Sequence, residues 1–424
     1  MPNTSGALGG TVETFLPKEQ SRRLGQEKVA VAYLFAIVSL DLHFFRGFFA
    51  NVLVISVALA LIVYTPENFR ARLLGYDWLY LSYLSFIVYS AVWSLSPSTT
   101  LEQALPLALP WIAALLLCGL SAVWVARIVV RFAIVVALLS PAMIFVSSKL
   151  AYQPRSSSGA PELRGVFYHQ LALGAFLTIA LGLIVISYLN GHGQEVLGRS
   201  RILRGCALIL ILGVLVLARA RLHVGSGVIA LALTCLLSKR GSRKWVAVNL
   251  LVVAGAVTAS FVNALRGYLD STGFDTTLTG RTYVWERILT GIEADARTLG
   301  HGFGSLQLPE FDHLFANYRA SHAHNYLIQA YFDTGLVGLT LLIILLVVLL
   351  GTAWRSSVKS NTYSYSLFLV LFCIITGLTS GVLAVALSAP FCLMLLFLAI
   401  ESRGSSASVK TPTGRRLFSH RLAV

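Results

Sequence analysis

The stretch HAHNYLIQAYFDTGLVGLTLLIILLVVLL, residues 322–350, decides the fold. It opens with two histidines and an asparagine, and a long apolar run follows directly. A run of this length can cross roughly 30 Å of hydrocarbon, so it predicts a membrane-spanning helix over residues 325–351. His322 and His324 should therefore lie at the edge of the membrane, where a chemical role competes with a role in capping the helix.

The composition of the whole chain agrees with this stretch. Of the 424 residues 56% are hydrophobic and only 12% are charged, and the mean hydropathy is +0.76. A water-soluble globular protein of this length would not contain so large a share of apolar residues. The sequence indicates a polytopic membrane protein. Its polar, basic first 28 residues lack the pattern of a cleaved signal peptide, so we expect them in the cytoplasm.

Apolar stretches of spanning length recur along the chain. They lie near residues 29–45, 47–64, 78–96, 105–122, 128–148, 166–189, 203–218, 222–238, 245–262, 325–351, 364–385 and 387–400. The sequence therefore predicts an all-α integral membrane protein with about twelve transmembrane helices. The expected divisions are a cytoplasmic tail (1–28), helices one to nine (29–262), a long periplasmic helical loop (263–322), helices ten to twelve (323–400) and a basic cytoplasmic tail (401–424).

The distribution of basic residues supports this topology. Cytoplasmic connections of membrane proteins are enriched in Lys and Arg, and the predicted cytoplasmic side holds 22 of the 33 basic residues. The net charge of +15 then reflects topology and attraction to anionic lipid, and it does not indicate nucleic-acid binding.

Two arginines on the predicted outer side lie in a very short connection. Arg219 and Arg221 flank Ala220 between two apolar stretches, so they must lie at or inside the outer membrane boundary. One terminal arginine would simply reach the lipid headgroups, but two of them, followed by His223, favour a functional cavity.

The loop from residue 262 to 322 is far longer than the other connections, and loops of this length are usually functional. Its Thr282–Arg297 segment has apolar residues at the spacing of an amphipathic helix. Arg281 would sit at the first turn of that helix, where an anion is favoured. The glycines of GHGFGS, residues 300–305, permit tight turns or close approach of the backbone to a ligand.

Five stretches together resemble the O-antigen ligase and O-antigen polymerase superfamily. They are RGVFYHQLALG (164–174), ARLHVGSG (220–227), TGRTYVW (279–285), LGHGFGS (299–305) and HAHNYLIQAYFDTGLVG (322–338). The resemblance implies a bacterial inner-membrane glycosyltransferase whose active site faces the periplasm. Such enzymes transfer a glycan from undecaprenyl diphosphate to a hydroxyl, with inversion and without a metal or other cofactor. The acceptor is lipid A-core for a ligase and the next glycan chain for a polymerase; membrane lipids complete the expected partners.

The resemblance also assigns residues. His324 matches the basic residue that begins the last motif, Arg281 matches the loop arginine and Arg221 the membrane-edge arginine. Arg219 is an addition to the family pattern, so which of the two neighbours meets phosphate stays open. His169 stands where many relatives have asparagine.

The chemistry of these residue types fits the expected reaction. Arginine binds phosphate oxygens in a fork and keeps its charge, so Arg221, Arg281, Arg219 and Arg164 are candidates for binding the diphosphate. A neutral imidazole can accept a hydroxyl proton, which makes His324 the candidate base. Supporting roles are assigned to His322, Asn325 and His169.

Three alternatives remain at this level. The loop carboxylates could hold a metal, but they include no Asp-x-Asp pair, and two histidines alone are weak ligands for zinc. An O-antigen polymerase would use the same donor, and the single large outer loop favours the ligase. A polysaccharide flippase or exporter would also have many spans, but it would show repeated halves and broken helices at mid-membrane.

Overall fold

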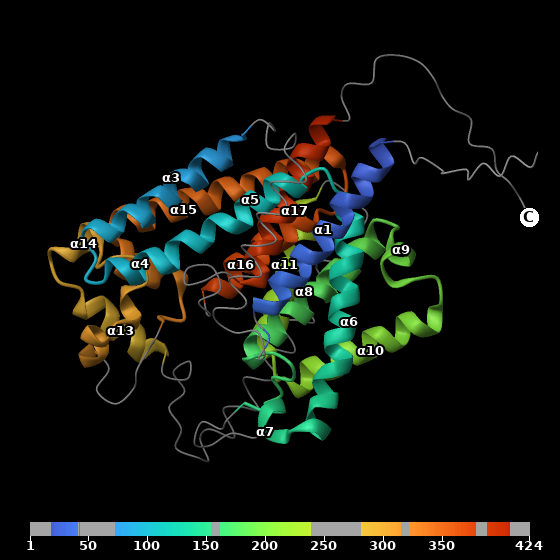
Figure 1. Ribbon diagram of the computed structural model, residues 1–424, viewed down its shortest axis with the longest axis horizontal. Coiled ribbons are helices and arrows are strands. Elements are labelled where there is room, and N and C mark those ends of the chain that lie inside the picture. The colour runs from blue at the N-terminus through green and yellow to red at the C-terminus, as the bar shows by residue number, and fades with distance from the viewer. Residues whose placement is uncertain are drawn as a thin grey trace, which may run out of the picture.

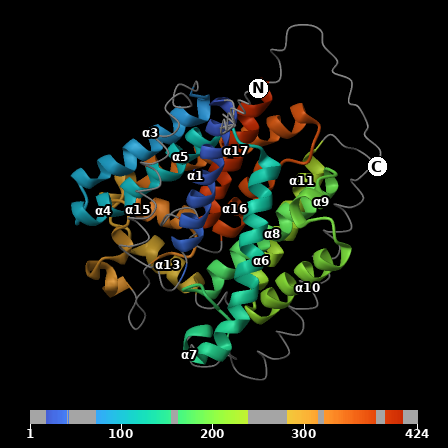
Figure 2. The ribbon, with the colours of Figure 1, turned by 45° about the vertical axis from the view of Figure 1, so that its right-hand side comes forward.

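The computed structural model describes residues 18–40, 42, 73–153, 162–238, 281–314, 322–378 and 388–407. Within these ranges the regular structure is helical, and the β-type pairing consists of two isolated bridges. The all-α prediction is therefore confirmed for the described part of the chain. The helices form two groups on opposite sides of a buried centre (Figures 1 and 2).

The first group lies on the left of Figure 1 and will carry much of the site. Its members are α3 (Gly75–Tyr89), α4 (Pro97–Ala104), α5 (Ala108–Leu117), α13 (Arg281–Gly291), α14 (Ala296–Leu299) and α15 (Tyr326–Ser360). Helix α15 packs against α3, α13 and α14. Segments more than 200 residues apart in the chain are thus neighbours here.

The second group is built on α6 and α8. Its members are α6 (Ala122–Val146), α7 (Ser148–Ala151), α8 (Gln170–Leu189), α9 (Gly193–Leu197) and α10 (Arg201–Leu217). The centre is filled by α1 (Lys18–Leu40), α11 (Arg221–Leu237), α16 (Tyr365–Gly377) and α17 (Ala389–Ala407). Helix α11 packs on α8 and α16, and α17 packs on α16 and α5, so the centre joins both groups.

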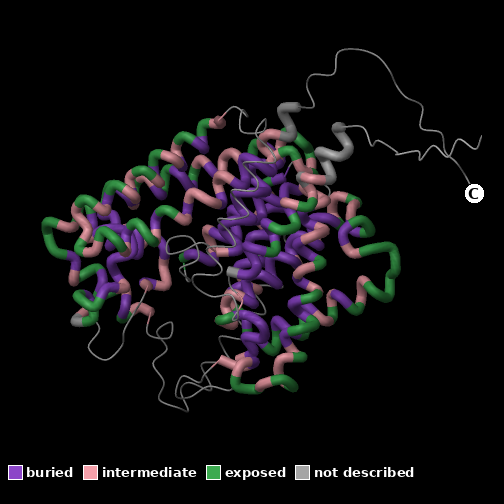
Figure 3. The backbone as a smooth tube through the Cα atoms, in the orientation of Figure 1, coloured by how far each residue is buried: buried purple, intermediate pink, exposed green. Residues whose placement is uncertain are grey.

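The central helices are buried, and the outer helices are more exposed. Residues 365–373 of α16 and 389–400 of α17 are buried without interruption, because these helices are apolar all round (Figure 3). Large apolar side chains are exposed on the outer helices instead, among them Leu138 on α6, Ile209 on α10 and Val347 on α15. Exposed apolar surface on a helix of this kind is suited to contact with lipid.

In the described part of the chain, four helical segments are long and apolar enough to cross a membrane, namely Pro97–Leu117, Ala122–Val146, Gln170–Leu189 and Tyr326–Ser360. Two shorter apolar helices, Arg221–Leu237 and Tyr365–Gly377, accompany them. Ten of the twelve predicted spans overlap a described helix, while those at 47–64 and 245–262 lie outside the described residues. An integral membrane helical protein is supported; the number twelve and the periplasmic side of the loop stay predictions.

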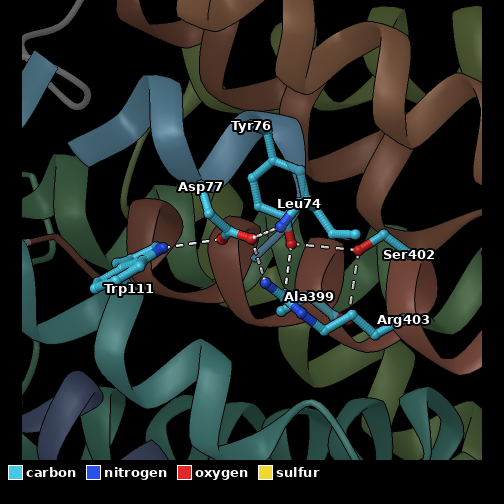
Figure 4. A network of polar contacts seen from close by, with 7 residues as sticks. All are labelled: Leu74, Tyr76, Asp77, Trp111, Ala399, Ser402 and Arg403. Carbon is cyan, nitrogen blue, oxygen red and sulfur yellow. Dashed lines mark hydrogen bonds and ion pairs between the residues drawn. The ribbon is translucent and has the colours of Figure 1, made fainter. Parts of the chain in front are cut away.

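A buried polar network ties three helices together at one end of the molecule (Figure 4). Asp77 of α3 accepts a hydrogen bond from Trp111 of α5 at 2.9 Å and forms an ion pair with Arg403 of α17 at 2.5 Å. Arg403 also donates to the Tyr76 hydroxyl at 2.6 Å. Because Asp77 is fully buried, its bonds with Trp111 and Arg403 offset the cost of removing the carboxylate charge from water.

At the opposite end, the segment that follows α14 lies beside the start of α15. The backbone N–H of Phe303 donates to Ser90 Oγ at 3.1 Å, and the Phe303 carbonyl accepts from Thr100 at 3.0 Å. These contacts dock the segment after α14 on the end of α3 and the start of α4. Helix α13, which begins at Arg281, packs on α15 at this end, and the two histidines of the opening stretch directly precede α15.

Candidate functional site

The histidines of the opening stretch directly precede α15, as predicted. Asn325 is the N-cap of this helix, and its side-chain oxygen accepts from the backbone N–H of Leu327 at 2.9 Å and of Ile328 at 3.3 Å. The rings of His322 and His324 lie 4.0 Å apart between centroids. His324 has a φ of 53°, a left-handed conformation that costs a histidine of order 1–3 kcal/mol. Such strain persists only where surrounding contacts hold it.

Arg281 is the first residue of α13, as the sequence predicts. Val284 and Ile288 are buried on one face of this helix, and Trp285 donates its ring N–H to the Ala323 carbonyl at 2.8 Å. The helix that carries Arg281 is thereby bonded to the residue between the two histidines. The predicted helix Thr282–Arg297 is wrong in length, because the structure divides it into α13 and the short α14.

His169 joins this site from a distant part of the chain. It is the N-cap of α8, and its Nδ1 accepts from the Leu171 N–H at 3.1 Å. A nitrogen that accepts carries no proton, so the neutral ring holds its proton on Nε2. His169 lies within electrostatic range of His322, His324 and Arg164.

Burial and neighbouring positive groups lower the pKa of each of these three histidines. The pKa of His324 falls to about 3, first because the ring is buried and then because of His322, Arg281 and His169. The pKa of His169 falls to about 4 by burial, His322 and Arg164, and burial and Arg281 lower that of His322. All three rings are therefore neutral at pH 7, the state in which an imidazole can accept a proton.

The two membrane-edge arginines lie at the turn between α10 and α11. Arg219 has a φ of 50°, and its carbonyl accepts from the Arg221 N–H at 2.8 Å. The Arg221 guanidinium is attracted by Glu162 and repelled by Arg219. Glu162 in turn accepts from the Gln170 amide at 2.6 Å, which connects this turn to the start of α8 beside His169.

Arg164 differs from the other arginines in its contacts. Its guanidinium donates to the backbone carbonyls of Leu150 at 2.9 Å, Lys149 at 3.2 Å and Tyr168 at 3.4 Å. These bonds fix the segment that leads to His169 against α7. A place for Arg164 in a phosphate clamp stays a prediction, and its observed contacts favour a positioning role.

His223 belongs to the same neighbourhood, although the sequence analysis assigned it no role. It is fully buried, and among the described residues neither ring nitrogen has a hydrogen-bond partner. The charges of Arg281 and His169 both act on it. Its sequence signal is its place two residues after Arg221, on the first turn of α11.

The glycine-rich segment 300–305 approaches α15. The N–H groups of His301 and Gly302 donate to the carbonyls of Phe332 and Asp333 at 3.1 and 2.9 Å. Helix α15 is broken opposite this segment by Gly335, whose φ is 64°. A side chain at Gly300 would collide with the α15 backbone, at 2.4 Å from Asp333 and Thr334 atoms. The sequence analysis considered tight turns or a close approach to a ligand for these glycines, and the close approach seen in the structure is to the broken helix.

Comparison with known proteins gives two findings. Residues 206–343 match the family model described as O-Antigen ligase, and this range contains four of the five stretches quoted above. The chain is also similar to the Exopolysaccharide production protein ExoQ of Rhizobium meliloti (strain 1021), with 35% identity over 118 residues. That match covers 25% of this chain and 26% of the relative, so the chain spans about a quarter of the curated protein it matches.

Proposed function

We propose, from the match of residues 206–343 to the O-antigen ligase family model, that the protein is an inner-membrane glycosyltransferase of the O-antigen ligase type. It transfers a glycan from undecaprenyl diphosphate to a hydroxyl of lipid A-core on the periplasmic side. The coarser statement, a membrane protein of the ligase and polymerase type in polysaccharide biosynthesis, rests directly on the family match and the helical membrane fold.

One observation carries the proposal. Helix α13 presents Arg281 at its first residue and bonds through Trp285 to Ala323, which lies between His322 and His324. The arginine and the histidine pair are therefore parts of one assembly, near enough for the arginine charge to act on both rings. A permanent cation beside a neutral imidazole suits a reaction that needs a stabilised anionic leaving group and a proton acceptor.

The proposed step is a displacement at the anomeric carbon. The acceptor hydroxyl oxygen forms the new bond to this carbon, and the bond to the diphosphate oxygen breaks with its electron pair on the leaving group. His324 accepts the hydroxyl proton. Arg281 and the Arg219–Arg221 turn stabilise the charge on the departing diphosphate through N–H groups that stay protonated. Attack opposite the leaving group inverts the anomeric centre.

The low pKa of His324, about 3 without substrate, bears on this role. A base so weak is poorly matched to a hydroxyl at pH 7. The diphosphate would bind the Arg281 side of the site and offset one cause of the lowered pKa. Binding of the lipid-linked donor therefore makes His324 a stronger base at the moment when a proton must be taken.

A second acceptor is favoured by the similarity to a protein named for exopolysaccharide production. In that alternative the hydroxyl belongs to a growing glycan, and the enzyme is a polymerase with the same donor. The residues proposed for the chemistry are the same in both cases. The ligase and the polymerase therefore differ only in the acceptor, which is lipid A-core in one case and a growing glycan in the other.

Purified protein in lipid nanodiscs would test the proposal. It would be incubated with undecaprenyl-diphosphate-linked glycan and lipid A-core, and the products would be identified by mass spectrometry. A glycosylated lipid A-core supports the ligase, while longer lipid-linked glycan formed from the donor alone supports the polymerase. If both substrates were recovered unchanged with donors that carry several different glycans, the transferase would be refuted. The alternative would then be a flippase that moves the same lipid-linked glycan across the membrane.

A further inference from the structure

Ala323, the residue between the two histidines, is held through both of its backbone polar groups. Its N–H donates to Gln329 Oε1 at 2.8 Å, and its carbonyl accepts from the Trp285 ring N–H at 2.8 Å. Ala323 is fully buried, so loss of either bond would leave a backbone group without compensation from water. One bond comes from α15 and the other from α13, so both helices fix the same residue.

The Gln329 side chain is itself oriented by Asp333, one turn further along α15. The Gln329 Nε2 donates to Asp333 Oδ2 at 2.9 Å. An ionised carboxylate only accepts, so the amide nitrogen must face it and the amide oxygen must face Ala323. Both side chains are 1% exposed, which removes competition from water.

Asp333 also connects this pair to the glycine-rich segment. Its Oδ1 accepts from Ser305 Oγ at 3.3 Å, and the backbone N–H groups of Gly304 and Leu306 donate to the same carboxylate. The full chain of contacts runs from the segment 304–306 through Asp333 and Gln329 to Ala323. It ends one residue before His324, whose left-handed backbone requires such support.

We propose that Gln329 and Asp333 are positioning residues that hold His324 in its left-handed conformation through the Ala323 N–H. The catalytic consequence rests on the function proposed above. If the Ala323 N–H is released, the backbone at His324 relaxes towards an ordinary φ and the imidazole moves. A displacement of about 1 Å at a reacting group can reduce turnover by as much as about 10²-fold.

Ordinary core packing is the competing explanation for the same pair. A packing role would lower stability, and side chains of equal volume would preserve it. A positioning role depends on which atoms donate and accept. The two roles can therefore be separated by substitutions that keep the shape of the pair and change only its hydrogen bonds.

The test uses four variants in the full-length protein. Gln329→Met keeps the length of the side chain and removes its hydrogen bonds. Gln329→Glu places two carboxylates together, and Asp333→Asn alone removes the group that orients the amide. The double variant Gln329→Glu with Asp333→Asn exchanges the two groups: the introduced asparagine can donate to the introduced glutamate, whose other oxygen can accept from Ala323.

The expected results concern turnover and hydrogen exchange. In Gln329→Met, kcat falls about 10- to 100-fold while KM for the lipid-linked donor stays near the wild-type value. Exchange of the backbone amides in a peptide covering residues 322–330, followed by mass spectrometry, becomes faster. The double variant recovers most of the turnover and protection that Gln329→Glu loses. Gln307→Met, in the neighbouring segment and without a role in this chain of contacts, serves as the matched control.

Two outcomes would overturn the inference. One is a Gln329→Met protein with wild-type kcat and unchanged exchange over residues 322–330. The other is a double variant no better than Gln329→Glu in either measurement. If wild-type protein transfers no glycan at all, the proposed function fails, and the exchange measurement alone then decides whether Gln329 and Asp333 hold the histidine backbone.

Discussion

At the scale of single residues, the site combines permanent positive charge with neutral histidines. Arg281 stays charged at any working pH, and its charge is one cause of the low pKa values of His322 and His324. Burial is the larger cause for both rings. Under the proposed function, such a site would bind an anionic donor lipid and keep an imidazole free of its proton. Three predictions at this scale test the roles separately.

Replacement of His324 by alanine should abolish most transfer without unfolding the protein. A general base contributes typically about 10²- to 10⁴-fold, so turnover should fall by that factor. The donor should still bind, since the arginines remain. The measurement is transfer from lipid-linked donor with binding assayed in parallel, and His322→Ala is the neighbouring control with a milder effect. Near-normal turnover would remove His324 from the chemistry, and loss of donor binding would reassign it to the phosphate site.

Conserving the charge of Arg281 should not conserve its function. In Arg281→Lys the ammonium keeps a positive charge but cannot bind two phosphate oxygens in the fork geometry. We expect most transfer activity to be lost, and activity of the wild type to survive EDTA. Arg287→Lys, two turns along the exposed side of the same helix, is the matched control. Wild-type activity that disappears with EDTA and returns with magnesium would contradict the metal-independent mechanism.

The lowered histidine pKa values predict an unusual pH profile. The folded pKa of His324, about 3, lies below the ordinary value of 6.5, so the free enzyme keeps a neutral base as the pH falls from 8 to about 5. Since kcat/KM reports the free enzyme, it should stay level over that range. In the proposed complex the bound diphosphate would offset the contribution of Arg281 to the lowered pKa, so kcat should decline at a higher pH than kcat/KM. A kcat/KM curve that falls through an apparent pKa near 6.5 would refute this assignment.

At the scale of elements, the break in α15 creates the surface on which the glycine-rich segment docks. A Cβ at Gly335 would lie 2.3 Å from the Thr298 carbonyl group. Contacts of this kind place α14 and segment 300–305 against the first turns of α15. The helix is therefore interrupted at the residue where a neighbouring backbone needs room.

Two glycines of α15 should respond in opposite ways to alanine. Gly335→Ala introduces a collision and a φ of 64° that alanine tolerates poorly, at a cost of at least about 1–3 kcal/mol. Gly351 has no atom within 4 Å of the added group, so Gly351→Ala should be neutral or stabilising by up to about 1 kcal/mol. Thermal unfolding in detergent would show a lower Tm for the first only. Equal Tm values would mean that the segment docks elsewhere.

At the scale of the whole molecule, the two ends of the helical body differ in their polar groups. One end has the Asp77–Arg403 ion pair and Glu401, which accepts from the backbone N–H of Tyr365 at 2.9 Å. The other end has the histidines and Arg281. A bundle with unlike ends has a defined orientation in a membrane, and the charge distribution predicts that the histidine end faces the periplasm.

Thiol labelling tests this orientation. Cysteines would replace Thr290 on α13 and Gln194 on α9, both of which are exposed, in a background where the exposed Cys206 is serine. In cells with a permeabilised outer membrane, a membrane-impermeant reagent should label the first position and not the second. Reversed labelling would place the histidines in the cytoplasm and contradict the proposed acceptor.

Several features of the site were predictable because they depend on local sequence. A long apolar run defines a spanning helix whatever its neighbours are. Arg281 begins a helix with apolar residues at helical spacing, as predicted, whereas the N-cap of α15 is Asn325 and not one of the histidines for which a capping role was considered. The motif stretches also showed a resemblance to the superfamily, and the match of residues 206–343 to the O-antigen ligase family model agrees with it.

Other features were decided only by the tertiary structure. His322 acts on the charge of His169 although the two lie far apart in the chain. Packing against neighbouring helices buries His223. Arg164 donates to carbonyls on the far side of a turn. The break at Gly335 and the bonds that hold Ala323 depend on helices packing at a particular depth and angle. Periodicity and caps specify each helix by itself, whereas these contacts arise only when the helices share one core.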